Sequence, residues 1–346
     1  MKALVYHGYH DMRLEERPVP VPQDDEVLIK VRVASVCGTD TGIYQLKEPT
    51  KRFYPPLVLG HEFTGEIAAC GRNAKKYPLG TRVAADPQLY CGECFYCQRG
   101  DINMCANRAS LGTSIGKTTD GSMQEYFAIR ESAIIPLDPR VSDEEGSMLE
   151  PLAVCYYAAL LGSFGKGERV LVSGATGPIG LFVIKFLKIM GASCIIASGR
   201  TDWKLEYAKK CGADEIVNIR NKDLEKTVRD LTDGVGVDRV IIAAGEGTAI
   251  PESYKLVRNG GRIVVVAINY CDVTIDPVQL VVRNISIMGS YMFRHEQQLE
   301  VMNMLAEGKL KAGDIITSTC PLSEGVQLFE KLVTTGSKDI KVLITA

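Results

Sequence analysis

Hydrophobic and polar positions follow two different patterns along the chain. Before about residue 150, short apolar runs are separated by Pro, Gly and Asp, which is typical of β-strands joined by turns. The clearest of these runs are "MKALVYH", "EVLIKVRVAS" and "EFTGEIAAC". The segment "GSMLEPLAVCYYAALLGSFGKG" then has helical spacing until Gly165–Gly167. These patterns predict a β-rich first part and a change of architecture near residue 150.

Apolar strands and amphipathic helices alternate in the next part of the chain. The predicted strands are "RVLVSG", "SCIIASG", "DEIVNI", "VDRVIIAAG" and "RIVVVAI". The predicted helices are "PIGLFVIKFLKIMG", "WKLEYAKKCG", residues 222–232 and "IPESYKLVRNGG". Such alternation predicts an α/β fold with a doubly wound parallel sheet. The strand "ISIMGSYMF", helices near 295–307 and in "EGVQLFEKLVTTG", and the strand "IKVLITA" are expected to follow.

Length and composition narrow the class of protein. A chain of 346 residues exceeds the usual size of a single core, so two domains are expected. Its formal charge is 40 − 42 = −2 and no dense basic run occurs, which disfavours nucleic-acid binding. No apolar segment approaches the roughly 20 residues that span a bilayer, and no signal peptide is recognised. We therefore expect a cytoplasmic protein with a small-molecule partner and no membrane.

Four of the eleven cysteines are clustered in "CGECFYCQRGDINMC". Cys91, Cys94, Cys97 and Cys105 are separated by two, two and seven residues. Four thiolates on one loop match tetrahedral Zn²⁺ and leave no open position, so this site is predicted to be structural. An iron–sulfur cluster also uses four cysteines, but its bacterial signature has other spacings and ends in Cys-Pro.

A glycine-rich turn lies between a predicted strand and a predicted helix. "VLVSGATGPIG" contains Gly174, Gly177 and Gly180, with Pro178 and Ile179 beside them. Glycines here permit a tight turn and let backbone N–H groups approach a pyrophosphate at the helix N-terminus. The motif is GxxGxxG rather than the usual GxGxxG. Close packing between a strand and a helix can also require glycines at such positions. The βαβ context favours dinucleotide binding.

The end of the next strand indicates which dinucleotide binds. Enzymes that use NAD carry an acidic residue about twenty positions after the glycines, for the ribose 2′-OH. This chain has Gly199 there and then Arg200, whose guanidinium suits a 2′-phosphate. We therefore predict NADP(H), with Asp202 reaching the ribose as the alternative. Other expected cofactor contacts are Ser198, Thr201, Lys204, Ala244 and Val266.

A second set of metal ligands is spread along the chain. Cys37 lies in "ASVCGTDTGIY", His61 and Glu62 in "LGHEFTGEI", and Glu150 in "LEPLAV" near the expected domain boundary. Cys, His and Glu are common zinc ligands, and three of them leave a fourth position open for substrate. Singly, Cys37 is equally compatible with a buried hydrophobe, His61 with a turn residue and Glu150 with a helix cap.

The order and spacing of these motifs resemble those of the zinc-dependent medium-chain alcohol dehydrogenases. "CGTD", "GHE", the four-cysteine segment, "EPLAV", the glycine-rich turn and "NGGRIVVV" carry this resemblance over essentially the whole chain. It is nearest to the branch of sorbitol, threonine and polyol dehydrogenases. The resemblance implies a β-rich GroES-like catalytic domain over 1–150 and 287–346, and a Rossmann domain over 151–286.

The resemblance also implies roles for individual residues. Cys37, His61 and Glu62 would bind a catalytic zinc, and Glu150 would bind it directly or through water. Asp40 would orient the histidine. Zinc would act as a Lewis acid on the alcohol, and Thr39 would take up its proton while hydride passes to the nicotinamide.

One position departs from the family pattern. In many relatives the proton passes from this hydroxyl along a relay to a histidine three residues later. This chain has Gly42 at that position, three residues after Thr39. The relay would then end at the ribose and water. By the same analogy the substrate pocket would be lined by Tyr44, Phe53, Tyr291, Phe293 and Arg294, with a surface salt bridge as the alternative for Arg294.

Three other functions remain open at this stage. They are an NAD-linked threonine- or butanediol-type dehydrogenase, a zinc-free quinone reductase of the same fold, and a non-catalytic NADP(H)-binding protein with structural zinc only. The Cys/His/Glu triplet disfavours the quinone reductase. The family also leads us to expect a homodimer or homotetramer formed through "ISIMGSYM".

Overall fold

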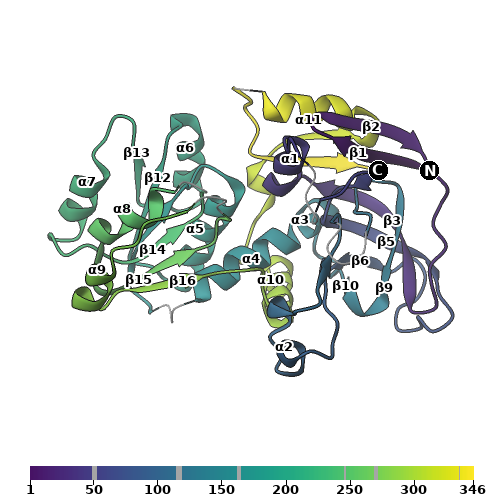
Figure 1. Ribbon diagram of the computed structural model, residues 1–346, viewed down its shortest axis with the longest axis horizontal. Coiled ribbons are helices and arrows are strands. Elements are labelled where there is room, and N and C mark those ends of the chain that lie inside the picture. Colours follow the sequence, from purple (N-terminus) through teal and green to yellow (C-terminus); the bar gives the residue numbers. More distant parts are fainter. Residues whose placement is uncertain (49–52, 114–118, 162–164, 245–246, 269–271, 335) are drawn as a thin grey trace. The chain divides into compact units, whose positions relative to one another are not determined.

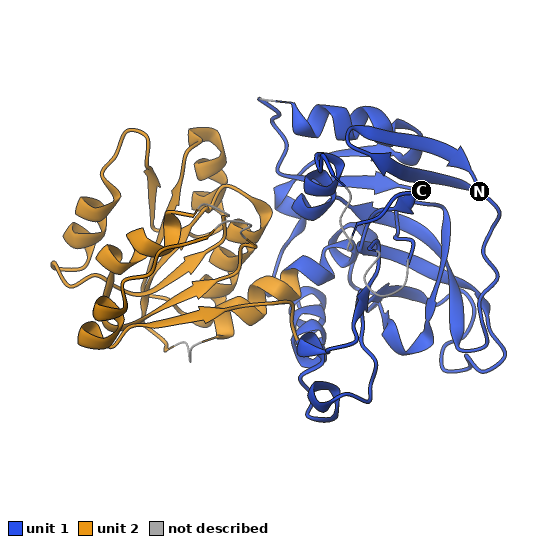
Figure 2. Cartoon of the chain, viewed as in Figure 1, with its two compact units in different colours: residues 1–151, 294–346 blue, residues 152–293 orange. Residues whose placement is uncertain are grey.

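The computed structural model describes residues 1–346 apart from 49–52, 114–118, 162–164, 245–246, 269–271 and 335 (Figure 1). It divides into unit 1, residues 1–151 and 294–346, and unit 2, residues 152–293 (Figure 2). The second boundary therefore lies at 293/294, whereas the sequence analysis placed it at 286/287. The reason is that strand β16 (Ser286–Gly289) pairs with the sheet of unit 2.

Unit 2 is built on a parallel sheet, which confirms the predicted Rossmann fold. Its strand order within the described residues is β13-β12-β11-β14-β15-β16, which in chain order is 3-2-1-4-5-6. Every neighbouring pair is parallel. The strands are β11 (Arg169–Ser173), β12 (Cys194–Gly199), β13 (Glu215–Asn218), β14 (Val237–Ile242), β15 (Val257–Val265) and β16.

The helices of unit 2 connect these strands and pack against the sheet (Figure 1). They are α5 (Pro178–Met190), α6 (Asp202–Lys210), α7 (Leu224–Leu231), α8 (Ala249–Leu256) and α9 (Pro277–Arg283), with α4 (Leu149–Leu160) at the boundary of the units. Helix α5 begins with Pro178 at its first turn and ends at Gly191, whose φ of 88° only glycine adopts easily. Leu181, Phe182 and Val183 on this helix are fully buried, as its apolar periodicity predicted.

Two predicted segments of unit 2 differ from the structure. Helix α8 ends at Leu256, so the "VRNGG" part of the predicted helix belongs to β15. Val257 is fully buried and pairs with Val237, and Gly260 has a φ of 69°, so sheet pairing prevails over helical spacing there. The strand predicted in "ISIMGSYMF" is limited to Ser286–Gly289.

Unit 1 contains antiparallel strands, as the short apolar runs separated by Pro, Gly and Asp predicted. Within the described residues, one seven-stranded sheet has the order β10-β6-β5-β3-β18-β17, with β9 also pairing with β3. Its strands are β3 (Glu26–Ser35), β5 (Glu62–Cys70), β6 (Arg82–Ala85), β9 (Tyr126–Arg130), β10 (Ile134–Pro136), β17 (Ile316–Pro321) and β18 (Lys341–Thr345). The smaller sheets consist of β1 (Lys2–Gly8), β2 (Asp11–Glu16) and β4 (Leu57–Val58), and of β7 (Gln88–Leu89) and β8 (Ala109–Ser110).

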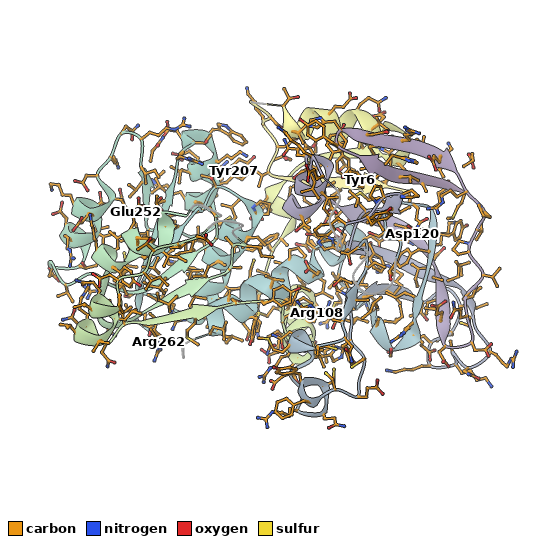
Figure 3. The ribbon with its side chains drawn as sticks, in the orientation of Figure 1. Tyr6, Arg108, Asp120, Tyr207, Glu252 and Arg262 are labelled. Carbon is orange, nitrogen blue, oxygen red and sulfur yellow. The ribbon has the colours of Figure 1, made fainter. Side chains whose placement is uncertain are left out.

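Short helices complete unit 1. They are α1 (Gly38–Tyr44), α2 (Phe95–Gln98), α3 (Asp143–Ser147), α10 (His295–Ala306) and α11 (Gly325–Val333), with 3₁₀ turns at Ile102–Met104, Glu131–Ala133, Gly313–Ile315 and Leu322–Glu324. The core includes Tyr6, labelled in Figure 3, together with Ile29 and Phe127. Among the described helices, none has the length and apolarity needed to cross a membrane.

Candidate metal centres and nucleotide site

Cys37 is held at the junction between strand β3 and helix α1. It is the N-cap of α1, where its Sγ accepts a hydrogen bond from the backbone N–H of Thr39 at 3.4 Å. Its own backbone N–H donates to Asp40 Oδ2 at 2.8 Å. This reciprocal cap satisfies backbone groups that the helix leaves unpaired. It also fixes the direction of the sulfur.

Strand register brings His61 and Glu62 beside Cys37. Strand β5 starts at Glu62 and runs antiparallel to β3, with Glu62 opposite Ser35. The start of β5 and the end of β3 therefore lie at the same edge of the sheet. One ligand atom from each of Cys37, His61 and Glu62 lies within 4.8 Å of the others. The structure thus brings together three predicted donors that are up to 25 residues apart in sequence.

Glu62 is buried and its two carboxylate oxygens differ in their contacts. Oε2 accepts hydrogen bonds from Ser35 Oγ and from the ammonium of Lys341. Oε1 is buried and has no hydrogen-bond partner among the residues that the structure describes. A buried carboxylate oxygen without a partner is costly, and a cation bound there would remove that cost. The donor set Cys, His and Glu with this unpartnered oxygen fits zinc.

Electrostatic interactions in this cluster favour a bound cation. Burial lowers the pKa of His61, but Cys37, Asp40 and Glu150 outweigh it and bring the pKa well above its usual value. Burial also lowers the pKa of Lys341, and the charges of Glu62 and Cys37 raise it above its ordinary value, so the ammonium remains charged. Both shifts have the same physical cause, an excess of negative groups in a buried space.

Glu150 lies outside the tight group of donors. It is in the first turn of α4 and only 7% exposed. Among the described residues the metal-ligand group contains Glu62 and not Glu150. Burial raises the pKa of Glu150 to about 7, with His61 opposing the shift and Glu62 adding to it. Glu150 is therefore close enough to interact electrostatically with the cluster, and its binding to the metal, directly or through water, stays a prediction.

The four cysteines of the 91–105 segment form a compact cluster of sulfurs. The Sγ–Sγ distances are 3.5 Å for Cys91–Cys105, 3.6 Å for Cys94–Cys97, 3.9 Å for Cys94–Cys105 and 4.0 Å for Cys91–Cys97. A tetrahedron with Zn–S bonds of about 2.3 Å has edges of about 3.8 Å. Backbone N–H groups of Cys97 and Ala106 lower the pKa of Cys94 to about 6, which favours its thiolate. Arg108, labelled in Figure 3, donates to the Cys105 carbonyl at 3.4 Å.

The glycine-rich turn of unit 2 joins β11 to α5. Gly174 has a φ of 80°, and a Cβ there would lie 2.2 Å from the Cβ of Ala244. A Cβ on Gly180 would meet the Ala175 backbone at 2.6 Å. Among the described residues, a Cβ on Gly177, the N-cap of α5, would meet no atom within 4 Å, and no side chain caps this helix. The uncapped N–H groups and the open space beside Gly177 fit a pyrophosphate.

The end of β12 lacks an acidic side chain. Ser198 and Gly199 are buried at the strand end, and Arg200 follows and is exposed. Thr201 is the N-cap of α6, and Lys204 Nζ lies 5.2 Å from the ring centroid of Trp203. Asp202, the alternative ribose ligand, accepts a hydrogen bond from Asn218 Nδ2 at 2.7 Å. On the opposite side of β11, Val266 N donates to the carbonyl of Ile242 at 3.0 Å.

The residues expected to line a substrate pocket are largely packed in the interior. Tyr44 and Phe53 belong to the hydrophobic core of unit 1, and Phe293 is fully buried. Tyr291 is half-buried in unit 2. Arg294 is 46% exposed and pairs with Asp101 Oδ1 at 2.5 Å. The structure thus gives Arg294 the surface salt bridge that the sequence analysis considered as its alternative role.

Sequence reasoning missed Ser35 and Lys341, which both contact Glu62. The available signal was the position of Lys341 as the charged residue in the apolar segment "IKVLITA", where it is the first residue of β18. Lysine is almost never buried unless it is paired. A lysine that starts a strand of buried residues therefore points to a buried acidic partner.

The fold and the site define a class of proteins, namely nicotinamide-dependent dehydrogenases that combine a Rossmann unit with a GroES-like unit. Two family models match in agreement with this. The model described as "Alcohol dehydrogenase GroES-like domain" matches residues 23–139, and the one described as "Zinc-binding dehydrogenase" matches residues 178–307.

Known enzymes resemble the chain over nearly its whole length. D-arabitol-phosphate dehydrogenase of Enterococcus avium is 35% identical over 97% of this chain and 94% of that protein. Sorbitol dehydrogenase of Halalkalibacterium halodurans is 32% identical over 100% and 99%. L-threonine 3-dehydrogenase of Bacillus licheniformis is 34% identical over 95% of each chain.

Solved structures give the same result. A zinc-binding dehydrogenase from Sinorhizobium meliloti bound to NADP has a TM-score of 0.90 at 26% identity, over 100% of this chain and 99% of that one. An alcohol dehydrogenase from Escherichia coli with NADH has a TM-score of 0.91 at 28% identity, with the same coverage. The chain belongs to the zinc-dependent medium-chain alcohol dehydrogenase family, in the branch of sorbitol, arabitol-phosphate and threonine dehydrogenases. It is an oxidoreductase of the alcohol and polyol dehydrogenase type that acts on CH–OH groups with a nicotinamide coenzyme.

Proposed function

We propose that the chain is an NADP(H)-linked zinc dehydrogenase that interconverts a secondary alcohol, polyol or sugar derivative and its ketone. The observation that carries this proposal is the convergence of Cys37, His61 and Glu62, with Glu62 Oε1 buried and without a hydrogen-bond partner within the described residues. A Cys/His/Glu set supplies three protein donors and leaves a position for substrate, as in catalytic rather than structural zinc sites.

Residues around the donors would orient them and move a proton. When bound, zinc supplies a Lewis acid for the alcohol oxygen and the nicotinamide accepts the hydride. Asp40 accepts hydrogen bonds from the backbone N–H groups of Cys37 and Gly60, and its carboxylate faces the His61 ring. This position suits a residue that orients the histidine. The backbone N–H of Thr39 donates to the Cys37 sulfur, which holds Thr39 beside this donor. Thr39 is also exposed, so its hydroxyl is accessible to accept the proton of the alcohol.

The charges at the end of β12 support NADP(H) over NAD(H). The strand end has no carboxylate, Arg200 is exposed beside it, and Asp202 is bonded to Asn218. A guanidinium pairs well with a phosphate, whereas an NAD site needs a carboxylate for the ribose hydroxyls. The two similar solved structures carry NADP in one case and NADH in the other, so similarity alone does not select the coenzyme.

The names of the relatives and the absence of the relay histidine support the proposed substrate class. Two of the three relatives named above act on a polyol or its phosphate, according to their names. Gly42 leaves the outer end of the relay without a histidine, which suits a substrate whose own hydroxyls or water can take over the proton. An NAD-linked dehydrogenase of threonine or butanediol is the second candidate, favoured by the 34% identity to L-threonine 3-dehydrogenase.

The decisive experiment is a panel of alcohols and ketones assayed in parallel with NADP⁺ and NAD⁺, together with zinc analysis. The panel should contain sorbitol, arabitol, their phosphates, threonine and 2,3-butanediol. We expect turnover with a polyol or polyol phosphate, a preference for NADP⁺ and two zinc ions per chain. Turnover of threonine with NAD⁺ would establish the second candidate. One zinc ion that survives Cys37→Ser, with no turnover, would indicate a binding protein with structural zinc only.

We further propose that the protein is a cytoplasmic homodimer or homotetramer. Strand β16 is the last strand of its sheet, so one of its edges is unpaired within the described residues. On helix α9, which contacts β15, Val278, Val281 and Val282 lie on one face and are 62%, 80% and 76% exposed. Four cysteines clustered at metal-ligand spacing in residues 91–105 are more typical of a reducing compartment than of an oxidising one, which supports the cytoplasmic location. Val281→Glu should shift the mass measured by light scattering toward the monomer, and an unchanged mass would place the interface elsewhere.

A further inference from the structure

A lysine of strand β18 is buried against the candidate catalytic metal site. Lys341 is the first residue of β18, and its side chain is 2% exposed. Its ammonium pairs with Glu62 Oε2 and donates to the carbonyl of Val36 at 3.1 Å. A buried ammonium is costly unless it is paired and hydrogen-bonded, and both conditions hold here. The interaction is therefore part of the built interior.

The ammonium joins the two segments that carry the donors. Val36 directly precedes Cys37, and Glu62 directly follows His61. Strand β18 also pairs with the end of β3, with Leu343 opposite Ser35. Lys341 therefore contacts both ligand-bearing segments from a third strand.

The same contacts give the oxygens of Glu62 different roles. Lys341 and Ser35 both donate hydrogen bonds to Oε2, whereas Oε1 has no partner in the described part of the chain. A carboxylate that binds a metal through both oxygens takes two coordination positions. One that binds through a single oxygen leaves a position free, which a catalytic zinc site requires.

We propose that Lys341, together with Ser35, is a positioning residue that restricts Glu62 to one-oxygen binding and so keeps a coordination position open for substrate. This inference rests on the proposed function, because it assumes that the Cys37, His61 and Glu62 group binds a metal. It makes a prediction that a purely structural role does not. Removing the Lys341 ammonium should preserve metal binding, because its charge no longer repels the metal ion and the second oxygen of Glu62 becomes available as a ligand. That second oxygen would then occupy the position that substrate needs.

The test uses the cobalt-substituted protein. The difference in visible absorption between the native chain and Cys37→Ser isolates cobalt in the Cys37 site, because the four-cysteine site is common to both. Imidazole is then added as a small ligand for the open position. We compare Lys341→Met, which removes the charge, with Lys341→Arg, which restores it, and with Lys30→Met, which removes an exposed lysine from β3. Ser35→Ala provides a second variant that keeps the ammonium.

We expect Lys341→Met to retain cobalt and to lose intensity in the ligand-field bands. It should also bind imidazole at least about tenfold more weakly, because the second oxygen of Glu62 would occupy the coordination position that imidazole needs. Lys341→Arg should recover most of the imidazole affinity, Ser35→Ala should be intermediate, and Lys30→Met should match the native chain. Loss of cobalt from Lys341→Met and from Ser35→Ala, or unchanged imidazole binding in both, would overturn the inference. Absence of a cobalt signal at Cys37 in the native chain would instead overturn the proposed function, and the inference with it.

Discussion

Asp40 Oδ1 lies 3.7 Å from Nδ1 of His61, and the two side chains are 1% and 15% exposed. The same carboxylate accepts hydrogen bonds from the backbone N–H groups of Cys37 and Gly60. Burial raises the pKa of Asp40, and the neighbouring His61 opposes that shift. Asp40 therefore connects the backbone around one donor with the ring of another.

Asp40→Asn should weaken metal binding and leave folding intact. The amide oxygen can still accept from Cys37 N–H, but the negative charge facing His61 is lost. We expect zinc affinity to fall about 10–100-fold, measured as zinc retained after dialysis against graded chelator. Asp223→Asn is the matched control, because Asp223 caps α7 through a 2.9 Å bond to Lys226 N. Equal zinc retention by native chain and Asp40→Asn would contradict the role assigned to Asp40.

Gly42→His should change the pH dependence of turnover without changing zinc content. A Cβ at Gly42 meets no atom of the described residues within 4 Å, so the side chain can be accommodated. An imidazole three residues after Thr39 would add a group that titrates near neutral pH. The measurement is kcat against pH for the native chain, Gly42→His and Gly42→Ala. If the histidine and alanine variants give the same profile, the relay does not extend to position 42.

Arg200→Ala should selectively impair the use of NADP⁺. Loss of charge-assisted hydrogen bonds to a 2′-phosphate corresponds to an increase in KM of about 10–100-fold, whereas KM for NAD⁺ should stay within about twofold of the native value. Steady-state kinetics with both coenzymes give the ratio directly. Asp202→Asn serves as the comparison, because Asp202 is bonded to Asn218. A larger loss with NAD⁺ in that variant would indicate an NAD enzyme.

Asp86→Asn should stabilise the protein at high pH. Burial raises the pKa of Asp86 to about 7, against opposing hydrogen bonds from Gln88 N and Nε2. A folded-state pKa above the unfolded value means that stability is lost as pH rises between the two. Relative to the native chain, the variant should gain up to about 4 kcal/mol in unfolding free energy between about pH 4 and pH 8.

The comparison for Asp86 is Asp138→Asn, which should show the opposite sign. Hydrogen bonds from Arg140 lower the pKa of Asp138 to about 2, so its contribution is present at neutral pH and disappears in acid. Urea unfolding at several pH values measures both variants. A pH-independent difference between Asp86→Asn and the native chain would show that Asp86 is ionised in the folded protein throughout this range.

Cys94→Ser should remove about one zinc ion per chain and loosen the segment 91–105. Three remaining thiolates do not complete a tetrahedral site, and structural zinc contributes directly to local folding. Limited proteolysis should then cut within this segment. In Cys37→Ser the segment should stay resistant although about one zinc ion is also lost. Cleavage in both variants would mean that the two sites fold as one.

The sequence allowed the fold to be predicted because each element has a local pattern. The alternation after β11 and the cap residues around α5 are encoded in consecutive positions, and both are found in the structure. The convergence of Cys37 with His61 followed from motif resemblance, and its physical cause is the register that places Ser35 opposite Glu62. Register is a long-range property that periodicity does not reveal.

The remaining differences have the same physical origin. Lys341 contacts a residue 279 positions away, and the pairing of β18 with β3 that positions it is absent from any local pattern. The boundary between α8 and β15 depends on pairing with β14 rather than on helix propensity. Tyr44 and Phe53 stay predicted pocket residues, and their burial in the core of unit 1 depends on residues from several strands, which no local pattern reveals.

The discontinuity of unit 1 has a consequence for biosynthesis. A ribosome delivers Cys37, His61 and Glu62 early, but Lys341 follows only after all of unit 2 has been translated. The nascent chain thus contains Cys37, His61 and Glu62 before the Lys341 ammonium that pairs with Glu62 has been synthesised. A chain interrupted after residue 293 would contain every proposed zinc donor and still lack strand β18, which pairs with β3 and carries Lys341. The open coordination position for substrate is therefore expected to form only late in maturation.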